Sequence, residues 1–232
     1  MLEIPPILTI RRNFDRPDPA LVARLKGALT GNIADSLGGR AALDPAIKPL
    51  AGCPESMQSL VGPVITCQWA PADHLGAMGA LAHAQPGDVI VAATEGYRGV
   101  AVMGDLMLGM ARNKGLAGLV TDGPVRDVKG IFEVGLPVFC TGINPDSPSG
   151  LGPGSVGQPV TIGGATVEPG DVVVADVNGV VIVPQAKLAI LVDKLQEVLA
   201  AEAEMEAKVS AGLESPESWQ ALFTSDKVRY LD

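Results

Sequence analysis

The sequence predicts an α/β fold built on a mixed β-sheet. Short apolar runs alternate with helical patterns over residues 86–140, which predicts a βαβαβ unit with right-handed crossovers. These runs are apolar throughout, as in strands that are buried on both faces of a sheet. Residues 169–175 (PGDVVVA) also echo residues 86–92 (PGDVIVA), which predicts two similar turn-plus-strand units in one core.

The segment before residue 86 contains three helical patterns and one strand pattern. Asp18 is a plausible N-cap because Pro19 and spaced apolar residues follow it, and Gly31 is expected to end this helix. Asn32 and Asp35 are interpreted as capping residues, with a minor chance of lining a pocket. The expected elements are helices over 19–30, from residue 32 or 34 to Gly38-Gly39, and over 73–84, with a strand over 61–69.

From residue 86 onward, glycine and proline mark the ends of most elements. The Pro/Gly/Ser-rich stretch 144–157 is interpreted as an exposed connection inside one domain of residues 1–232. The tail 215–232 contains Trp219, Phe223 and Tyr230, and it is expected to dock on the body or on a neighbouring subunit. The expected elements are strands after Asp88, over 118–121 and 136–140, from 160, after Asp171 and over 180–183, and helices over 99–115, from 127 to 133 and over 187–211.

Composition excludes several classes of protein. The formal net charge is −9 and no basic run occurs, so nucleic-acid binding is disfavoured. Cys53, Cys67 and Cys140 have no CxxC spacing, which indicates buried free thiols in a reducing compartment. No signal-peptide pattern and no apolar run of about 18 residues is present, so we expect a cytoplasmic protein with no membrane partner.

Two glycine-led segments can carry chemistry: 104–107 (GDLM) and 122–127 (DGPVRD). Alone, Arg126-Asp127 is more simply a helix N-cap and a surface ion pair. Each segment delivers a carboxylate at the end of a strand or the start of a helix, Asp105 in one and Asp127 in the other, and Arg126 adds a guanidinium. A hard cation such as Mg²⁺ takes one or two protein carboxylates and completes its shell with water and substrate oxygens, and Arg126 could stabilise an enolate.

These residues resemble the class II pyruvate aldolases related to 4-hydroxy-4-methyl-2-oxoglutarate aldolase, which share a fold with the RraA-like regulators of a ribonuclease. The resemblance runs nearly end to end and implies an RraA-like swivelling β/β/α domain. The motifs that carry it, by their order and spacing, are Pro86-Gly87-Asp88, Gly104-Asp105-Leu106, Val125-Arg126-Asp127, Gly135-Leu136-Pro137-Val138, Pro169-Gly170-Asp171, Gly179-Val180-Val181 and Arg229-Tyr230-Leu231-Asp232.

The resemblance implies a role for each site residue. Asp127 would hold the divalent metal directly and Asp105 would hold it through a water molecule that serves as base. Arg126 would stabilise the pyruvate enolate, and the backbone at Gly104, Leu106 and Met107 would receive the pyruvate carboxylate. The metal would be Mg²⁺, with Mn²⁺ or Co²⁺ as alternatives. The resemblance also implies a homotrimer or homohexamer in which a neighbour's acidic residue approaches the site. Glu204 is the best candidate for this residue, and Glu202 and Glu206 are its rivals. Without the resemblance, this acidic helix is more simply interpreted as a solvated face.

One position departs from the aldolase pattern. These enzymes often carry an acidic residue three positions after the metal-binding aspartate, whereas this chain has Gly130 there and its next acid is Glu133. The departure puts the surroundings of the metal and the substrate in question. The presence of Asp127 itself favours an enzyme, because regulators without catalysis tend to lose that carboxylate.

Other residues in the chain carry weaker signals. His74 and His83 fall half a turn apart on one helical pattern, which disfavours a histidine metal site. Arg98 could contact a distal substrate carboxylate. No Gly-x-Ser-x-Gly elbow, no Gly-x-Gly-x-x-Gly loop and no lysine in an apolar strand-end setting occurs, so serine hydrolase, dinucleotide and Schiff-base chemistry are disfavoured.

The sequence therefore predicts a lyase that cleaves a 4-hydroxy-2-oxo acid to pyruvate and a second oxo acid. The substrate would be of the 4-hydroxy-4-methyl-2-oxoglutarate or 4-carboxy-4-hydroxy-2-oxoadipate type, as in aromatic degradation, with oxaloacetate decarboxylation as a side activity. The main alternative is a non-catalytic RraA-type regulator that binds a protein partner. A third, methyl transfer to a demethylmenaquinone, lacks a recognisable glycine-rich nucleotide loop.

Overall fold

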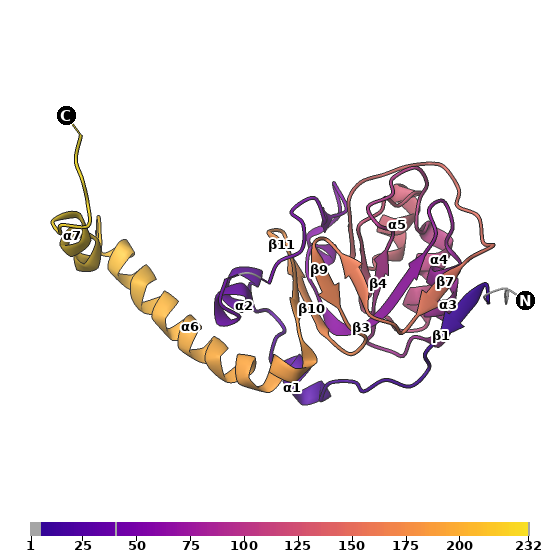
Figure 1. Ribbon diagram of the computed structural model, residues 1–232, viewed down its shortest axis with the longest axis horizontal. Helices are drawn as coiled ribbons and strands as arrows, with labels where there is room; N and C mark the ends of the chain where they lie inside the picture. Colours follow the sequence, from indigo (N-terminus) through magenta and orange to yellow (C-terminus); the bar gives the residue numbers. More distant parts are fainter. Residues whose placement is uncertain (1–5, 40, 232) are drawn as a thin grey trace, which may run out of the picture.

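The computed structural model describes residues 6–39 and 41–231 and is centred on a nine-stranded mixed sheet (Figure 1). Its main path has the order β1-β7-β3-β4-β5-β6-β2, and β10 and β11 extend from β3. The α/β prediction is therefore confirmed. The strands are β1 Leu8–Ile10, β2 Lys48–Pro49, β3 Leu60–Trp69, β4 Val89–Ala93, β5 Gly118–Thr121, β6 Val138–Cys140, β7 Gly154–Val156, β10 Val172–Asp176 and β11 Gly179–Val183, with β8 Val160–Ile162 and β9 Ala165–Val167 as a separate pair.

Helices cover both sides of these strands, as Figure 1 shows. Helices α3, α4 and α5 lie on one side, and α1, α2 and α6 lie beyond the β10–β11 hairpin on the other. Their bounds are α1 Pro19–Ala23, α2 Thr30–Ser36, α3 Leu75–His83, α4 Asp105–Asn113, α5 Val128–Val134, α6 Leu188–Ser210 and α7 Glu217–Phe223, with 3-10 turns at Glu55–Met57 and Gln185–Lys187.

These layers arise because side chains along each strand point alternately to the two faces of the sheet. In β10, Val173 and Ala175 belong to the apolar cluster shared with the parallel strands, whereas Val172 and Val174 belong to the cluster under α1, α2 and α6. Successive side chains of a strand point to opposite faces, so a run of buried valines serves two cores at once. The prediction of strands buried on both faces is confirmed.

The predicted βαβαβ unit is also present. Strands β4, β5 and β6 are parallel neighbours, and α4 and α5 connect them. In such a unit the carboxyl ends of the strands meet at one edge, where the connecting loops gather and ligands collect. This edge positions the cavity described below.

The sequence echo is a repeated turn. Gly87 and Gly170 both adopt left-handed backbone, with φ of 88° and 93°. In each copy the following aspartate accepts a hydrogen bond from the backbone N–H three residues before it, at 2.8 Å for Asp88 and 2.9 Å for Asp171. The echo therefore reflects one turn motif used twice to start a buried strand.

The predicted helix over 19–30 is wrong beyond Ala23. The Asp18 cap is present, with its carboxylate accepting from the Ala20 N–H at 2.8 Å, but Gly27 turns with φ of 80° and the next helix begins at Thr30. Asp176 fixes that start, because its carboxylate accepts from both the backbone N–H and the hydroxyl of Thr30. Gly31 consequently lies inside α2 rather than ending a helix.

Two further expectations need correction. Residues 99–104 precede α4 as an irregular segment with bends rather than as helix, because their backbone bonds to other loops: Ala101 N–H donates to Asp146 O and Val102 N–H to Pro124 O. The connection 144–157 contains β7, which pairs with β1 and β3. In neither segment does the local sequence pattern reveal the distant chain that satisfies its backbone.

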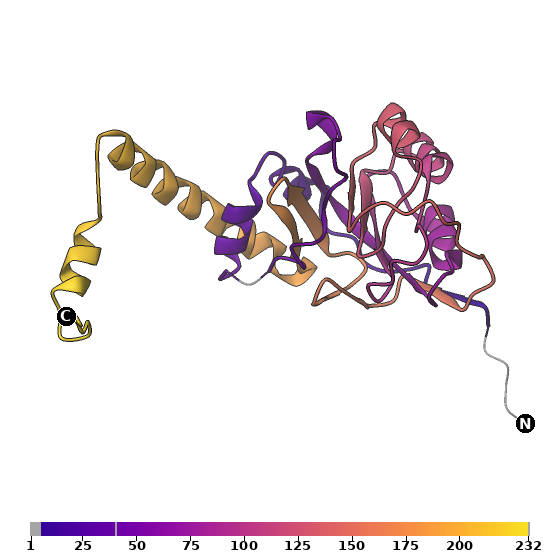
Figure 2. The ribbon, with the colours of Figure 1, turned by 90° about the horizontal axis from the view of Figure 1, so that it is seen from above.

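The C-terminal arm, formed by the second half of α6 and by α7, projects from the body (Figures 1 and 2). The first half of α6 packs on the hairpin through buried Leu188, Leu191, Val192 and Leu195. Beyond it, Trp219, Phe223 and Tyr230 are each at least half exposed, so the tail does not dock on its own body; docking on a neighbour stays a prediction. Asp232, which closes the last quoted motif, lies outside the described residues.

The structure also bears on the three cysteines and on the possibility of a membrane-spanning helix. Cys53, Cys67 and Cys140 are free and buried, as predicted, and burial raises the pKa of Cys140 to about 11. Among residues 6–39 and 41–231, no helix combines the length and the apolar character that a bilayer crossing requires.

Candidate active site

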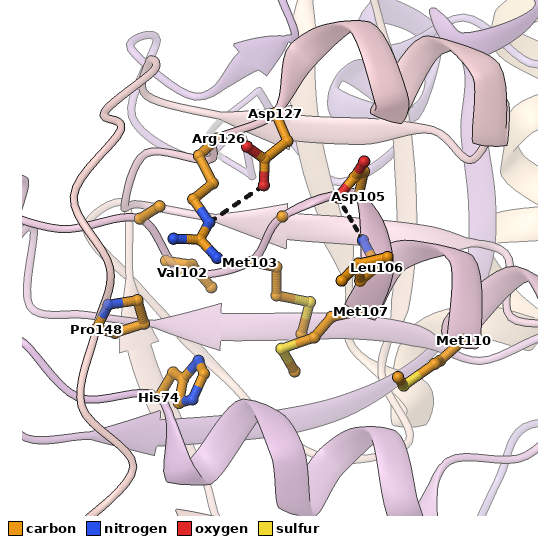
Figure 3. A pocket seen from close by; sticks show the side chains of 12 residues that line it. His74, Val102, Met103, Asp105, Leu106, Met107, Met110, Arg126, Asp127 and Pro148 are labelled. Atoms are coloured by element: carbon orange, nitrogen blue, oxygen red, sulfur yellow. Dashed lines mark hydrogen bonds and ion pairs between the residues drawn. The ribbon is translucent and has the colours of Figure 1, made fainter.

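A cavity of about 270 Å³ opens where α4 and α5 begin (Figure 3). It brings together all the predicted site residues except Glu204: Gly104, Asp105, Leu106, Met107, Arg126 and Asp127. Its remaining lining is His74, Ala101, Val102, Met103, Met110 and Pro148. Asp105 and Arg126, with twenty residues between them in the chain, thus belong to one site, because parallel strands carry both segments to the same sheet edge.

Asp127 occupies the N-cap position of α5 in an unusual conformation. Its φ of 63° is left-handed, and its side chain makes no capping hydrogen bond. The carboxylate is directed instead toward Arg126, whose Nε lies 3.2 Å from Asp127 Oδ2. Gly104 makes room for it, because a Cβ there would overlap that same oxygen. The carboxylate is 45 % exposed and keeps acceptor capacity for a ligand.

Arg126 is held from two directions. Its Nε faces Asp127, and its Nη1 donates to the hydroxyl of Ser147. Its backbone N–H donates to Met103 O at 3.1 Å, and Met103 is itself a cavity-lining residue. A guanidinium fixed in this way presents a permanent positive charge, and it leaves other N–H groups free for an anionic ligand.

Asp105 is the first residue of α4 and lies beside the beginning of α5. Its Oδ1 accepts from the Leu106 N–H at 2.7 Å (Figure 3). The other oxygen lies against Gly130, where a Cβ would overlap it. Gly130 is the position at which the sequence departs from the aldolase pattern, so the space of the missing acidic side chain accommodates Asp105. The Leu106 N–H can receive a substrate carboxylate only after Asp105 releases it.

The donor set suits a hard, hydrated cation. In the described part of the chain, no group of three or more His, Cys, Asp or Glu side chains is arranged to hold a metal. Asp105 and Asp127 nevertheless provide oxygen donors on adjacent helix starts, and glycines make room for both. Mg²⁺ is typically bound by one or two carboxylates, with water and substrate completing its shell. The residues therefore fit Mg²⁺ and do not fit a closed zinc site.

His74 is the cavity residue that the sequence analysis missed. The helical pattern treated it as a position inside a helix, but the helix begins at Leu75 and His74 is its N-cap residue. Its ring therefore points into the cavity, across from Arg126 and Asp127 (Figure 3). The sequence signal for it was Asp73, the preceding residue. The Asp73 carboxylate accepts from the backbone N–H groups of residues 151 and 152, and so fixes the segment 146–152, here called the strap, beside the ring.

Several candidates lie away from the cavity. Asp122 is buried and accepts from Thr94 and Gly96, so it holds a loop together. Arg98 is exposed and lines a different depression, which corrects its expected approach to substrate. Asn32 is not a cap: it is buried inside α2 and donates to Glu202 of α6.

Within one chain, the acidic residues Glu202, Glu204 and Glu206 of α6 lie outside the cavity. Glu204 forms an exposed pair with Lys208, which lowers the pKa of the Glu204 carboxyl by hydrogen bonding and by charge. Glu202 is held by Asn32, and Glu206 is exposed. The expected approach of one of them to a neighbour's cavity stays a prediction.

The chain is thus a layered α/β protein whose cavity is lined by two carboxylates and one guanidinium. Comparison with known proteins then gives the family. The family model described as RraA-like: Aldolase/RraA matches residues 30–182, so the chain belongs to the RraA-like family. The family expected from the sequence motifs, and its fold, are therefore confirmed.

Individual relatives agree with this assignment. The chain is 37% identical over 155 residues to a protein of Halalkalibacterium halodurans provisionally named 4-hydroxy-4-methyl-2-oxoglutarate aldolase, covering 67% of this chain and 72% of that one. An uncharacterized protein from Pseudomonas syringae pv. tomato has a similar structure, with a TM-score of 0.74 and 26% identity over 86% of this chain and 96% of the other. Streptomyces coelicolor RraAS2, described as an unusual member of the RNase ES inhibitor RraA family, gives a TM-score of 0.72 and 30% identity over 83% and 100% of the two chains.

Proposed function

We propose that this protein is a divalent-metal-dependent aldolase that cleaves a 4-hydroxy-2-oxo acid to pyruvate and a second oxo acid. The substrate class is that of 4-hydroxy-4-methyl-2-oxoglutarate and 4-carboxy-4-hydroxy-2-oxoadipate. The observation that carries the proposal is the convergence of Asp105, Arg126 and Asp127 on one cavity. The aldolase name of a relative that is 37% identical supports it.

The chain's own residues suit the binding of a 2-oxo acid. Asp127 and Asp105 would hold Mg²⁺, Mn²⁺ or Co²⁺, and such an ion acts as a Lewis acid and lowers the pKa of water. Arg126 offers N–H groups to the oxygen on which the enolate charge develops. The backbone at the start of α4 offers N–H groups that lack helical acceptors, and these suit the substrate carboxylate.

The reaction requires one bond to break and two protons to move. The C4 hydroxyl loses its proton, the C3–C4 bond breaks, and its electron pair becomes the enolate of pyruvate while C4 becomes a carbonyl carbon. The enolate then takes a proton at C3 to give pyruvate. Asp105, half-buried in the lining of the cavity, is the carboxylate that we assign to relaying the hydroxyl proton. Oxaloacetate would lose CO₂ through the same enolate.

The proposed assembly is a homotrimer or a hexamer of two trimers. Its support is the projecting arm of α6 and α7, whose apolar side chains Met205, Val209, Trp219 and Phe223 are exposed in one chain. Such a surface is typical of an interface. A neighbour's Glu204 would then complete the site, with Glu202 and Glu206 as alternatives. Light scattering coupled to size-exclusion chromatography measures the subunit number.

A coupled assay tests the proposal. Pyruvate release is followed with lactate dehydrogenase and NADH, using 4-hydroxy-4-methyl-2-oxoglutarate or oxaloacetate, with Mg²⁺ and with EDTA. We expect Mg²⁺-dependent pyruvate release from both substrates, lost on chelation and restored by excess Mg²⁺. Absence of release under all conditions would favour the alternative, a regulator that binds a protein partner without chemistry.

A further inference from the structure

The cavity contains one polar side chain that the proposed reaction does not use. Its charged or titratable lining consists of His74, Asp105, Arg126 and Asp127. The last three serve the metal and the pyruvate end of the substrate. His74 lies on the opposite wall, with the apolar side chains of Met103 and Met107 between it and the acidic wall (Figure 3).

The strap, residues 146–152, bonds both to His74 and to Arg126, which lie on opposite walls of the cavity. The His74 backbone N–H donates to Ser149 O at 2.9 Å, while the hydroxyl of Ser147 accepts from Arg126. Asp73 locks this arrangement by accepting from the Ser149 hydroxyl at 2.8 Å and from two backbone N–H groups beyond it. The backbone of His74 therefore has a fixed place relative to the Arg126 guanidinium.

The strap also runs beside the ring. A Cβ on Gly150 would lie 3.6 Å from His74 Nε2, so an alanine at this position of the strap would reach ordinary van der Waals contact with the imidazole. Burial lowers the pKa of His74, and the charge of Arg126 adds to this effect, whereas the charge of Asp73 and a hydrogen bond with the backbone of Val102 oppose it. At neutral pH the ring is a neutral imidazole with one N–H donor and one acceptor nitrogen.

We propose that His74 is a specificity-determining residue that binds the C4 end of the substrate, the half that leaves as the second oxo acid. This inference rests on the proposed aldolase function. With the C1 carboxylate at the start of α4 and the C2 oxygen at Arg126 and the metal site, the chain of a 4-hydroxy-2-oxo acid extends past Met103 and Met107 toward His74. The methionines suit a small apolar C4 substituent, and the imidazole N–H suits one carboxylate oxygen.

This arrangement distinguishes the two candidate substrates. 4-Hydroxy-4-methyl-2-oxoglutarate carries one methyl group and one carboxylate on C4, which matches an apolar wall and a single neutral donor. 4-Carboxy-4-hydroxy-2-oxoadipate carries two carboxylates in that half, and one of them would meet apolar methionine surface without a partner, which is costly. The structure therefore favours the methyl-bearing substrate.

The test separates the two ends of the substrate. Exchange of the pyruvate C3 protons with ²H₂O, followed by NMR, needs only the pyruvate end, whereas cleavage of 4-hydroxy-4-methyl-2-oxoglutarate needs both. For His74→Ala we expect KM in the cleavage assay to rise about tenfold, the loss typical of one hydrogen bond to a charged group, with proton exchange within twofold of wild type. His74→Gln, which keeps an N–H donor, should recover part of the affinity.

Two controls complete the experiment. His83→Ala removes the other histidine, exposed in the last turn of α3, and should leave both activities unchanged. 4-Hydroxy-2-oxopentanoate lacks the distal carboxylate, so wild type and His74→Ala should cleave it with equal kcat/KM. An unchanged KM for the methyl-bearing substrate, or an equal loss of proton exchange and cleavage, would overturn the role of His74 in an active aldolase. A wild-type protein inactive in both assays would instead refute the aldolase function, and this inference with it.

Discussion

Two sets of aspartates in this chain differ in what surrounds their oxygens. In the turn framework, Asp73, Asp88 and Asp122 are at most 8% exposed, and each accepts several hydrogen bonds from fixed donors. At the cavity, Asp105 and Asp127 are more exposed, and each has a single strong partner. A carboxylate whose lone pairs are already committed stabilises loops, whereas one with free lone pairs can bind a ligand.

Asp127→Asn should have the largest effect on function. The amide keeps the shape but loses the charge that would hold the cation, so pyruvate release should fall to the rate without enzyme in the lactate dehydrogenase assay. Stability should change little, because this side chain makes no capping bond. Asp193→Asn, at an exposed position of α6, is the matched control and should retain full activity. Normal turnover by Asp127→Asn would refute the metal-binding role.

Arg126→Ala should lower kcat by about 10² or more, the typical cost of removing one group that stabilises an oxyanion. Arg126→Lys should recover only part of the rate, because an ammonium cannot face Asp127 and Ser147 in the same planar fork. Steady-state kinetics with oxaloacetate and with the hydroxy acid measure both variants. A change confined to KM would restrict Arg126 to ground-state binding.

Gly130→Ala sharpens the contrast between stability and function. A glycine-to-alanine change in a helix usually stabilises by about 1 kcal/mol, but here the new Cβ would displace the carboxylate of Asp105. We expect activity to fall about 10- to 100-fold, as when a group that orients a metal site is disturbed. Gly109→Ala in α4 is the control, since its Cβ would meet only a Val134 methyl group at 3.8 Å. Equal activity of the two variants would contradict the placement of Asp105.

Asp73→Asn tests the framework rather than the chemistry. We expect the free energy of unfolding to fall by about 2 kcal/mol, since several buried donors lose a charged acceptor. Burial alone would raise the pKa of Asp73, but hydrogen bonds from Leu75, Ser149, Leu151 and Gly152 outweigh it and hold the pKa below its ordinary value of 3.8. The wild-type stability from this group is therefore complete above pH 3.8 and is lost as the pH falls below it. Urea unfolding between pH 3 and 7 should show this loss in wild type and a smaller one in the variant.

Glu204→Gln should have the smallest effect on the isolated fold. The pair with Lys208 is exposed, so the midpoint of thermal unfolding should not change measurably. If a neighbour's Glu204 completes the cavity, the same variant should lower kcat while subunit number stays constant. Glu206→Gln on the same helix provides the comparison. Equal kinetics of both variants and wild type would remove these residues from the site.

Much of the fold was predictable because its signals are local. The PGD turns, the valine runs and the β4–β6 unit depend on short stretches of sequence, and each is present. The elements that were missed depend on distant partners. Thr30 starts α2 because Asp176 accepts from it, and β7 forms because β1 and β3 lie on either side of it.

The candidate site shows the same division. Asp105, Arg126 and Asp127 were found from motif spacing, and the structure brings them together, although their roles stay predictions. His74 was missed because one residue separates a helix interior from an N-cap, and this shift turns the ring into the cavity. Asp122 opens the segment 122–127 but lies outside the site, and sequence alone cannot show that its oxygens are already bonded.

A crystal structure of the protein soaked with Mn²⁺ and pyruvate would test the proposed metal site itself. We expect an anomalous scattering peak beside the Asp127 carboxylate, with pyruvate bound to the ion and one pyruvate oxygen within hydrogen-bond distance of Arg126. A cavity that stays empty at saturating Mn²⁺ and pyruvate, or an ion bound elsewhere while this cavity is vacant, would contradict this expectation.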